Sequence, residues 1–138
     1  MSEVAVSGRR LPISRSLVQR VVRTVLRRER RDALISVTFL GRDSMRRLNA
    51  EHKGQDRATD VLTFALTDPA GQIVGDVYIC PWVARQEAGA RGISLREELI
   101  RLIVHGTLHA LGRDHPEGPE RTRSAMWRRQ ERYVEALA

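Results

Sequence analysis

The sequence predicts a fold of the α+β class, or of the related α/β class, in which a mixed sheet of about four strands packs against about five helices. Three observations support this prediction. Helical and strand-like segments alternate along the chain, two strand-like segments lie close enough to form a hairpin, and 138 residues with 41% hydrophobic side chains suit one compact core. We therefore expect residues 1–138 to form a single domain.

The N-terminal part of the chain predicts a strand, a helix and a second strand. The first strand covers residues 4–8, and Ser14 is a candidate N-cap for a helix that continues to about residue 31. Apolar residues of this helix recur with a period of 3.6 and are Leu17, Val18, Val21, Val22, Val25 and Leu26. Its opposite face, which is either solvated or phosphate-binding, carries Arg20, Arg23, Arg27 and Arg30. The second strand covers residues 33–41.

The middle of the chain predicts a short helix and a β-hairpin. Asp43 is a candidate N-cap for a helix over DSMRRLNAEH. Residues 60–67 and 73–80 are then expected to pair around the turn DPAGQ. Gly75, inside the second of these strands, is a candidate β-bulge.

Three further helices are expected after the hairpin. Pro81 suits the first turn of a helix over WVARQEAGAR, which Gly92 ends. Ser94 and Glu97 are spaced as a capping box at the start of a long helix that runs to Leu111. The last helix is expected over residues 120–137, with its inward side formed by Ala125, Met126, Val134 and Leu137.

Positive charge is concentrated near the N-terminus. The net charge is +7, and residues 9–31 contain nine arginines against one acid, Glu29, which is a local excess of +8 and leaves −1 for the remainder. Such a region attracts polyanions, of which RNA, DNA and an anionic membrane are the candidates. Because Lys53 is the only lysine among 24 basic residues, the composition of the genome is an equally good explanation of the arginines.

The sequence favours a soluble, cytoplasmic protein. No apolar run approaches the ~20 residues that cross a bilayer, and the first residues lack the apolar stretch of a secretory signal. Cys80 is the only cysteine, so no internal disulfide is expected, and its apolar neighbours predict a buried thiol without a catalytic role.

Three of the four histidines lie in the segment HGTLHALGRDH, residues 105–115. His105 and His109 are four residues apart and therefore share one face of the predicted helix. Gly112 allows the chain to turn and to bring His115 back to the same point. Three imidazoles with an open fourth position are typical of a catalytic zinc site, although nickel, copper and iron also accept this ligand set. Scattered, unrelated histidines are the alternative, and His52, which stands alone, is expected to be solvated or to contact substrate.

This spacing is also that of the metzincin motif H-E-x-x-H-x-x-G-x-x-H, with one difference. The peptidases have a general-base glutamate after the first histidine, whereas this chain has Gly106. Peptidase activity is therefore disfavoured, and another metal-assisted hydrolysis is the better interpretation.

HGTLHALGRDH resembles the signature H-G-x-L-H-L-x-G-x-D-H of the YbeY family, bacterial metal-dependent endoribonucleases of rRNA maturation and ribosome quality control. Residues 48–64, LNAEHKGQDRATDVLTF, and residues 75–80, GDVYIC, resemble two further blocks of that family in the correct order. The resemblance implies one zinc ion per chain held by His105, His109 and His115, and a cytoplasmic location. It also implies cleavage of single-stranded RNA, notably at the 3′ end of 16S rRNA of the small subunit.

Other site residues follow from the same resemblance and from its departures. The family has an arginine where this chain has Lys53, which keeps the charge but lacks the bidentate fork that matches phosphate, and Arg57 could substitute for it. Asp114 is expected to orient an imidazole, or to make a simple turn or salt bridge. Asp60 is interpreted as a hydrogen-bonding residue at a strand start more readily than as a catalytic acid. Two rival functions remain: a non-catalytic ribosome-assembly factor with a structural metal, and a metal-dependent hydrolase of a small molecule or peptide.

Overall fold

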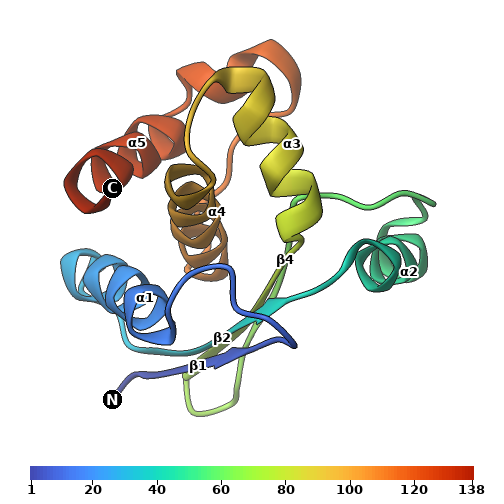
Figure 1. Ribbon diagram of the computed structural model, residues 1–138. Coiled ribbons are helices and arrows are strands. Elements are labelled where there is room, and N and C mark those ends of the chain that lie inside the picture. The colour runs from blue at the N-terminus through green and yellow to red at the C-terminus, as the bar shows by residue number, and fades with distance from the viewer.

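The computed structural model describes all residues, 1–138, and contains four strands, five α-helices and one 3-10 helix (Figure 1). In chain order these are β1 (Glu3–Ser7), α1 (Arg15–Glu29), β2 (Ala33–Phe39), α2 (Arg42–Lys53), β3 (Val61–Thr67), β4 (Ile73–Ile79), α3 (Pro81–Arg91), α4 (Leu95–Ala110), the 3-10 helix η1 (Gly118–Arg123) and α5 (Ala125–Leu137). None of the helices is long and apolar enough to cross a membrane.

The four strands form one mixed sheet in the order β1-β2-β4-β3. β1, β2 and β4 are parallel, and β3 pairs antiparallel with β4, its partner in the expected hairpin. The sheet register aligns Val6 with Val37 and Val37 with Val77. The predicted fold class, an α+β arrangement with a mixed four-stranded sheet, is therefore confirmed.

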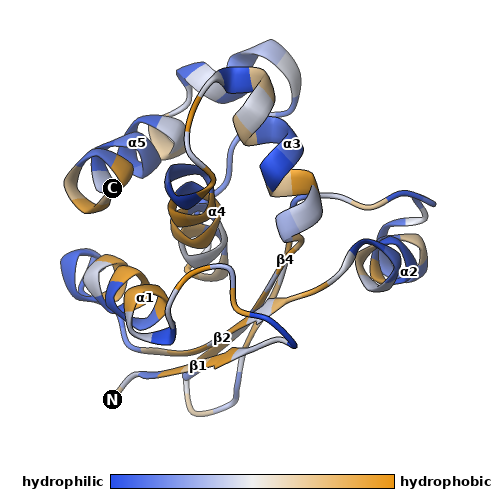
Figure 2. Cartoon of the chain, viewed as in Figure 1, coloured by the Kyte–Doolittle hydropathy of each residue, from blue (hydrophilic) through white to orange (hydrophobic).

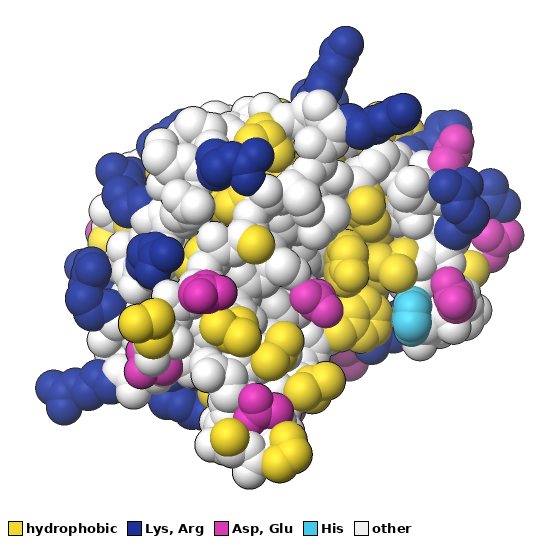
Figure 3. Space-filling view, turned by 90° about the horizontal axis from the view of Figure 1, so that it is seen from below, with side chains coloured by type: hydrophobic (Ala, Val, Ile, Leu, Met, Phe, Trp, Pro, Cys, Tyr) yellow, Lys and Arg dark blue, Asp and Glu magenta, His cyan; other side chains and the backbone are white.

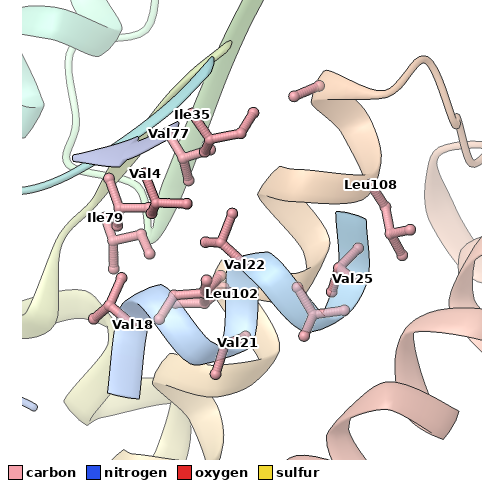
Figure 4. Close-up of a cluster of buried hydrophobic side chains, with 14 of the residues drawn as sticks. Val4, Val18, Val21, Val22, Val25, Ile35, Val77, Ile79, Leu102 and Leu108 are labelled. Atoms are coloured by element: carbon pink, nitrogen blue, oxygen red, sulfur yellow. The ribbon is translucent and has the colours of Figure 1, made fainter. Parts of the chain in front are cut away.

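The main core lies between one face of the sheet and the helices α1 and α4. In β2, alternate residues are buried, as expected for a strand with one covered face. Figure 4 shows Val22 of α1 directed toward Val77 and Ile35 of the sheet, and Val18 next to Ile79. α4 contacts α1, α3, α5, β3 and β4, and most of its residues are buried. α4 is therefore the central helix, and its position in the fold is fixed by contacts with three helices and two strands.

The other face of the sheet is covered only in part. A small second cluster of Met45, Leu62 and Cys80 fills the space between α2 and the sheet, so the predicted burial of the thiol is confirmed. Seen from below, hydrophobic and acidic side chains lie in the middle of the surface, while Lys and Arg gather around its rim (Figure 3).

The arginines predicted for the outer face of α1 are exposed.

Several predicted helix ends are confirmed in detail. The Ser14 hydroxyl accepts a hydrogen bond from the backbone N–H of Leu17 (3.1 Å) and caps α1. Gly92 ends α3 in the left-handed region with a φ of 67°. The capping box of α4 is only half formed: Ser94 accepts from the N–H of Glu97 (3.0 Å), while the Glu97 carboxylate turns to the Arg101 guanidinium at 3.1 Å.

Two predictions about α2 and β4 are wrong. The N-cap of α2 is Gly41, and Asp43 lies inside the first turn. There its negative charge interacts favourably with the helix dipole, but its side chain does not cap the helix. Gly75 forms no bulge, because it pairs regularly with Ile35 and Ala65. Its missing side chain serves close packing instead, since a Cβ there would lie 2.8 Å from the Cβ of Ala110.

The last predicted helix is also divided differently. Residues 118–123 form η1, and α5 begins only after Ser124, whose hydroxyl accepts from the N–H of Trp127 (3.1 Å). Ala125 is exposed at the start of α5, whereas Gln130 and Tyr133, which were not assigned to the inward side, are buried. The inward positions of Met126 and Val134 are confirmed, and Leu137 is half-buried against the core.

Candidate metal centre

The C-terminal end of α4 and the turn after it bring three histidines together. His105 and His109 lie on one side of the helix, and the chain then reverses at Gly112, whose φ of 91° is readily adopted only by glycine. The N–H of Arg113 closes this turn on the carbonyl of Leu108 (3.1 Å). His115 is thereby returned to the helix, and one ring nitrogen of each histidine lies within 4.8 Å of those of the other two.

Each ring also has an oxygen partner at its Nδ1 atom. Nδ1 of His105 lies 2.6 Å from Oε1 of Gln130, Nδ1 of His109 lies 3.5 Å from Oδ1 of Asp114, and Nδ1 of His115 lies 3.0 Å from the carbonyl oxygen of Pro116. A ring that donates its Nδ1–H to an oxygen keeps a lone pair on Nε2. The three Nε2 atoms are therefore available to one ion, with the partners that metal-binding histidines usually have.

The orientation of the Gln130 amide follows from its neighbours. Its Nε2 donates to Oε2 of Glu131 (3.0 Å), and that carboxylate also accepts two hydrogen bonds from Arg101, both at 2.9 Å. A carboxylate accepts hydrogen bonds and does not donate them, so the amide must present its NH2 group to Glu131 and its oxygen to His105. The tautomer of His105 is thus determined by a chain of contacts that links α4 to α5.

Arg101 anchors this chain of contacts. Its guanidinium is almost fully buried and lies within 3.2 Å of the carboxylates of Glu97, Glu98 and Glu131. Glu98 is buried as well and is shared with Arg91 of α3 at 3.1 Å. Burial raises the pKa of Glu98, while the two guanidinium groups favour its charged form. The network ties α3, α4 and α5 together directly behind His105.

The histidines are held in the form that binds metals. Burial lowers the pKa of His105 to about 4, and burial together with the neighbouring His115 lowers the pKa of His109. Both imidazoles are therefore neutral at pH 7, and only the neutral ring has a lone pair for an ion. The three rings offer three nitrogen donors to one metal ion, a donor set that zinc accepts, and no fourth side-chain ligand belongs to the group.

The residue after the first histidine has no room for a side chain. A Cβ on Gly106 would lie 2.5 Å from Cγ1 of Val77 and 3.1 Å from Oγ1 of Thr63. At this point the backbone of α4 lies directly against side chains of β3 and β4. The general-base glutamate of the metzincin peptidases does not fit here, which gives a physical reason for its absence.

A cavity of about 300 Å³ adjoins the histidines, and His105 forms part of its wall. Arg121 of η1 lines the same cavity, with its guanidinium 5.5 Å from the centre of the Trp127 ring. The Nε–H of Arg121 is the one buried side-chain polar atom without a hydrogen-bond partner. Sequence reasoning missed Arg121 and Gln130, because only the fold brings η1 and α5 next to His105.

The other predicted site residues lie in different surroundings. Asp114 is exposed, and its Oδ1 lies 3.5 Å from Nδ1 of His109, a contact that fits both the orienting role and the salt-bridge role expected from the sequence. Lys53, at the end of α2, has its Nζ 5.7 Å from the ring centre of Phe64, and the Arg57 guanidinium donates to Oε1 of Gln55 (3.0 and 3.2 Å). His52 is exposed and packs 4.9 Å from the same phenyl ring.

Asp60 acts as a hydrogen-bonding residue at a strand start, since its carboxylate accepts from the N–H of Val61 (2.8 Å). It also forms part of the wall of the cavity beside His105. The interpretation from the sequence therefore agrees with its local contacts.

The chain is similar to proteins of one family. The family model described as Endoribonuclease YbeY matches residues 7–138. A curated protein of that name from Thermotoga maritima is 33% identical over 113 residues, which cover 82% of this chain and 73% of the relative. One from Thermotoga neapolitana is 31% identical over 137 residues, 99% of this chain and 89% of the relative. A solution structure of a Thermotoga maritima protein superposes with a TM-score of 0.71 at 28% identity, covering 98% of this chain and 89% of the other.

Proposed function

Because the chain belongs to the Endoribonuclease YbeY family, we propose that it is a zinc-dependent endoribonuclease that cleaves single-stranded RNA. The observation that carries this proposal is the convergence of His105, His109 and His115, whose ligand atoms lie within 4.8 Å of one another at the edge of a cavity. The three side chains would hold one ion through their Nε2 atoms. A zinc ion held there would supply positive charge to polarise the phosphate or to activate the attacking oxygen.

The protein's own residues would prepare this site in two ways. Gln130 and Asp114 orient the rings of His105 and His109 through their Nδ1 atoms, so that little reorganisation is needed when the ion binds. Arg121 supplies a second positive charge in the cavity, where phosphodiester cleavage builds negative charge on the nonbridging oxygens.

Lys53 and Arg57 are proposed as contacts for phosphates farther along the RNA strand. Both side chains are exposed, Lys53 at the last residue of α2 and Arg57 in the segment that leads to β3, and neither is in a salt bridge with a carboxylate. Their charges are therefore free to attract the substrate. In this proposal Arg121, and not Lys53, is the cation next to the reacting phosphate.

The proposed substrate is precursor rRNA, cut at the 3′ end of 16S rRNA in the cytoplasm, with the ribosomal small subunit as partner. The basic surface supports a polyanionic substrate, since residues 9–31 carry a local charge of +8. The identity of the precursor rests on family membership.

The test compares the wild type with His109→Ala and with Gln86→Ala, a substitution on the exposed side of α3 outside the triad. All three proteins are loaded with zinc and incubated with a single-stranded RNA that spans the 3′ end of 16S rRNA. We expect cleavage by the wild type and by Gln86→Ala, and none by His109→Ala. Equal cleavage by the two variants would overturn the proposal. An RNA with 2′-deoxyribose at the cut site identifies the nucleophile, because continued cleavage excludes attack by the 2′-hydroxyl.

A second candidate is a ribosome-assembly factor in which the metal stabilises the fold. It is favoured by one observation: the network from His105 through Gln130 to Arg101 ties α4 to α5, so an ion on His105 would also stiffen that contact. The two candidates differ in a deletion strain. His109→Ala would restore rRNA processing if the protein acts only by binding, and would fail to do so if it acts by cleavage.

A further inference from the structure

A second cavity, of about 690 Å³, lies at the carboxyl ends of the parallel strands β1, β2 and β4. It is more than twice as large as the cavity beside the histidines, and the two share no residue. Its volume falls within the roughly 300–1,000 Å³ typical of ligand sites, which in sheets of this kind occur at the carboxyl ends of the strands. Its wall is formed by the loop after β1 and by the N-terminal turns of α2 and α3.

The wall of this cavity is strongly basic. Arg9, Arg10 and Arg85 line it, and no aspartate or glutamate does. None of these three guanidinium groups is in a salt bridge or hydrogen bond with another side chain, in contrast with Arg101 behind the histidines. The cavity therefore has an uncompensated positive charge of three, which favours an anionic ligand with more than one charge.

An exposed tryptophan lies in the same wall. Trp82 has 42% of its surface accessible and is one of only three large hydrophobic residues that are exposed. The Arg42 guanidinium lies 5.2 Å from the centre of its ring, and its one salt bridge is a 3.4 Å contact with the neighbouring Asp43. Aromatic rings next to guanidinium groups are what proteins use to stack unpaired bases and to hold the adjoining phosphates.

The backbone keeps the arginine-bearing loop in place. Gly8 has a φ of 151°, and a Cβ at this position would lie 3.1 Å from the carbonyl oxygen of Phe39 and 3.2 Å from its Cβ. The chain thus passes directly over the end of β2 before Arg9 and Arg10, in the hydrophilic segment that follows β1 in Figure 2. The sheet thus holds the backbone at the start of this loop, so less backbone freedom has to be given up when a ligand binds.

We propose that this cavity is a second RNA-contact site, in which an unpaired base stacks on Trp82 and the flanking phosphates bind Arg9, Arg10 and Arg85. The inference rests on the proposed function, from which the identity of the ligand as RNA is taken. Single-stranded RNA fits better than a duplex, because a paired base cannot leave its helix to stack on an indole. The site would increase the affinity for the RNA and would leave the chemical step at the histidines unchanged.

The first experiment uses the tryptophan itself as the probe. The protein has two tryptophans, so a Trp127→Phe background leaves Trp82 as the only indole. A short oligouridylate is titrated into this protein while RNA binding is followed in parallel by fluorescence anisotropy of a labelled strand. We expect quenching of Trp82 with the same midpoint as the anisotropy change. Unchanged emission at RNA concentrations that saturate the anisotropy would overturn the proposal.

The second experiment compares matched variants. Trp82→Ala is expected to weaken oligouridylate binding by about tenfold or more, the usual effect of removing one stacking ring. Arg9→Ala with Arg10→Ala should lower the slope of log K against log salt by about 1.4, or roughly 0.7 for each phosphate that these arginines no longer neutralise. Arg128→Ala with Arg132→Ala removes the same charge from the exposed face of α5, outside residues 9–31 and outside both cavities, and should change both values much less. Equal effects of the two double variants would mean that no specific site exists.

The outcomes separate this inference from the proposed function. If Trp82→Ala binds RNA as the wild type does while the wild type cleaves, the second site is refuted and the nuclease proposal stands. If His109→Ala still cleaves RNA and RNA quenches the emission of Trp82, the nuclease proposal is refuted and the second site stands. Vesicles of anionic phospholipid are tested in the same titration, and quenching by vesicles without quenching by RNA would also refute the RNA site.

Discussion

Gly106→Ala is the substitution that most sharply tests how α4 is packed at the histidines. The added Cβ would lie 2.5 and 3.0 Å from the two Cγ atoms of Val77, well inside the ~3.5–4.0 Å of an ordinary carbon contact. Val77 is fully buried and β-branched, so its χ1 is restricted and any staggered rotamer still directs at least one methyl group toward Gly106. The helix must therefore move away from the sheet or the strand must shift.

The expected effect is a loss of stability, although alanine is the better helix former. Overpacking of a core costs about 1–3 kcal/mol, and replacement of glycine by alanine inside a helix returns about 1 kcal/mol. With three contacts of 3.1 Å or less, we expect the upper part of that range and a net loss of about 2 kcal/mol. The same movement displaces His105 and should weaken zinc binding.

Gly89→Ala is the matched control, because it lies in α3, where a Cβ meets nothing within 4 Å. This variant should gain up to about 1 kcal/mol. Both variants are unfolded in urea with a chelator present, since bound metal would add its own stabilisation. In a Val77→Ala background the cost of Gly106→Ala should shrink, which a double-mutant cycle measures. A Gly106→Ala variant as stable as Gly89→Ala would refute the close packing.

The surroundings of the triad lead to three further predictions. Gln130→Leu removes the acceptor for Nδ1–H of His105 and should weaken zinc binding about 10–100-fold in a chelator competition, whereas Gln86→Leu on the exposed side of α3 should leave it unchanged. Arg101→Ala removes one of the two guanidinium partners of the buried Glu98 and the only salt-bridge partner of the half-buried Glu131, and should lower the urea unfolding free energy by about 3–5 kcal/mol. Arg46→Ala, which breaks an exposed pair, should have little effect, and equal effects of the two would contradict the role of burial. The metal-free protein should lose stability as the pH falls from about 6.5 toward 4. Burial lowers the pKa of His105 to about 4 in the folded state, so the unfolded state takes up the proton first, and the loss approaches about 3 kcal/mol. A urea midpoint that stays constant over this pH range would contradict the prediction.

Much of the fold could be predicted because its signals are local. The period of apolar residues in α1, the serine caps at Ser14 and Ser94 and the stop at Gly92 all act within a few residues, and each is observed. The start of the last helix was missed because Ser124 caps it more effectively than the preceding segment, which contains Gly118 and Pro119, can extend it. Local patterns thus predicted which elements form, and less well where they begin.

The histidine triad could also be predicted, because one helix and one turn bring its members together within eleven residues. Its supporting residues could not. Gln130 reaches His105 from 25 positions away, and Arg121 reaches the same cavity from η1. The steric role of Gly106 depends on strands far away in the sequence. Such contacts depend on the packing of α4 between the sheet and α5, which no local pattern encodes.

The central claim is that one ion on three imidazoles is needed for RNA cleavage. Its most direct test is a titration of zinc into the metal-free wild type, with bound metal and the initial rate of cleavage of single-stranded RNA measured on the same samples. We predict that the rate rises in proportion to bound zinc and stops rising at one equivalent per chain. Full cleavage by the metal-free protein, or a rate that does not follow zinc occupancy, would contradict the claim.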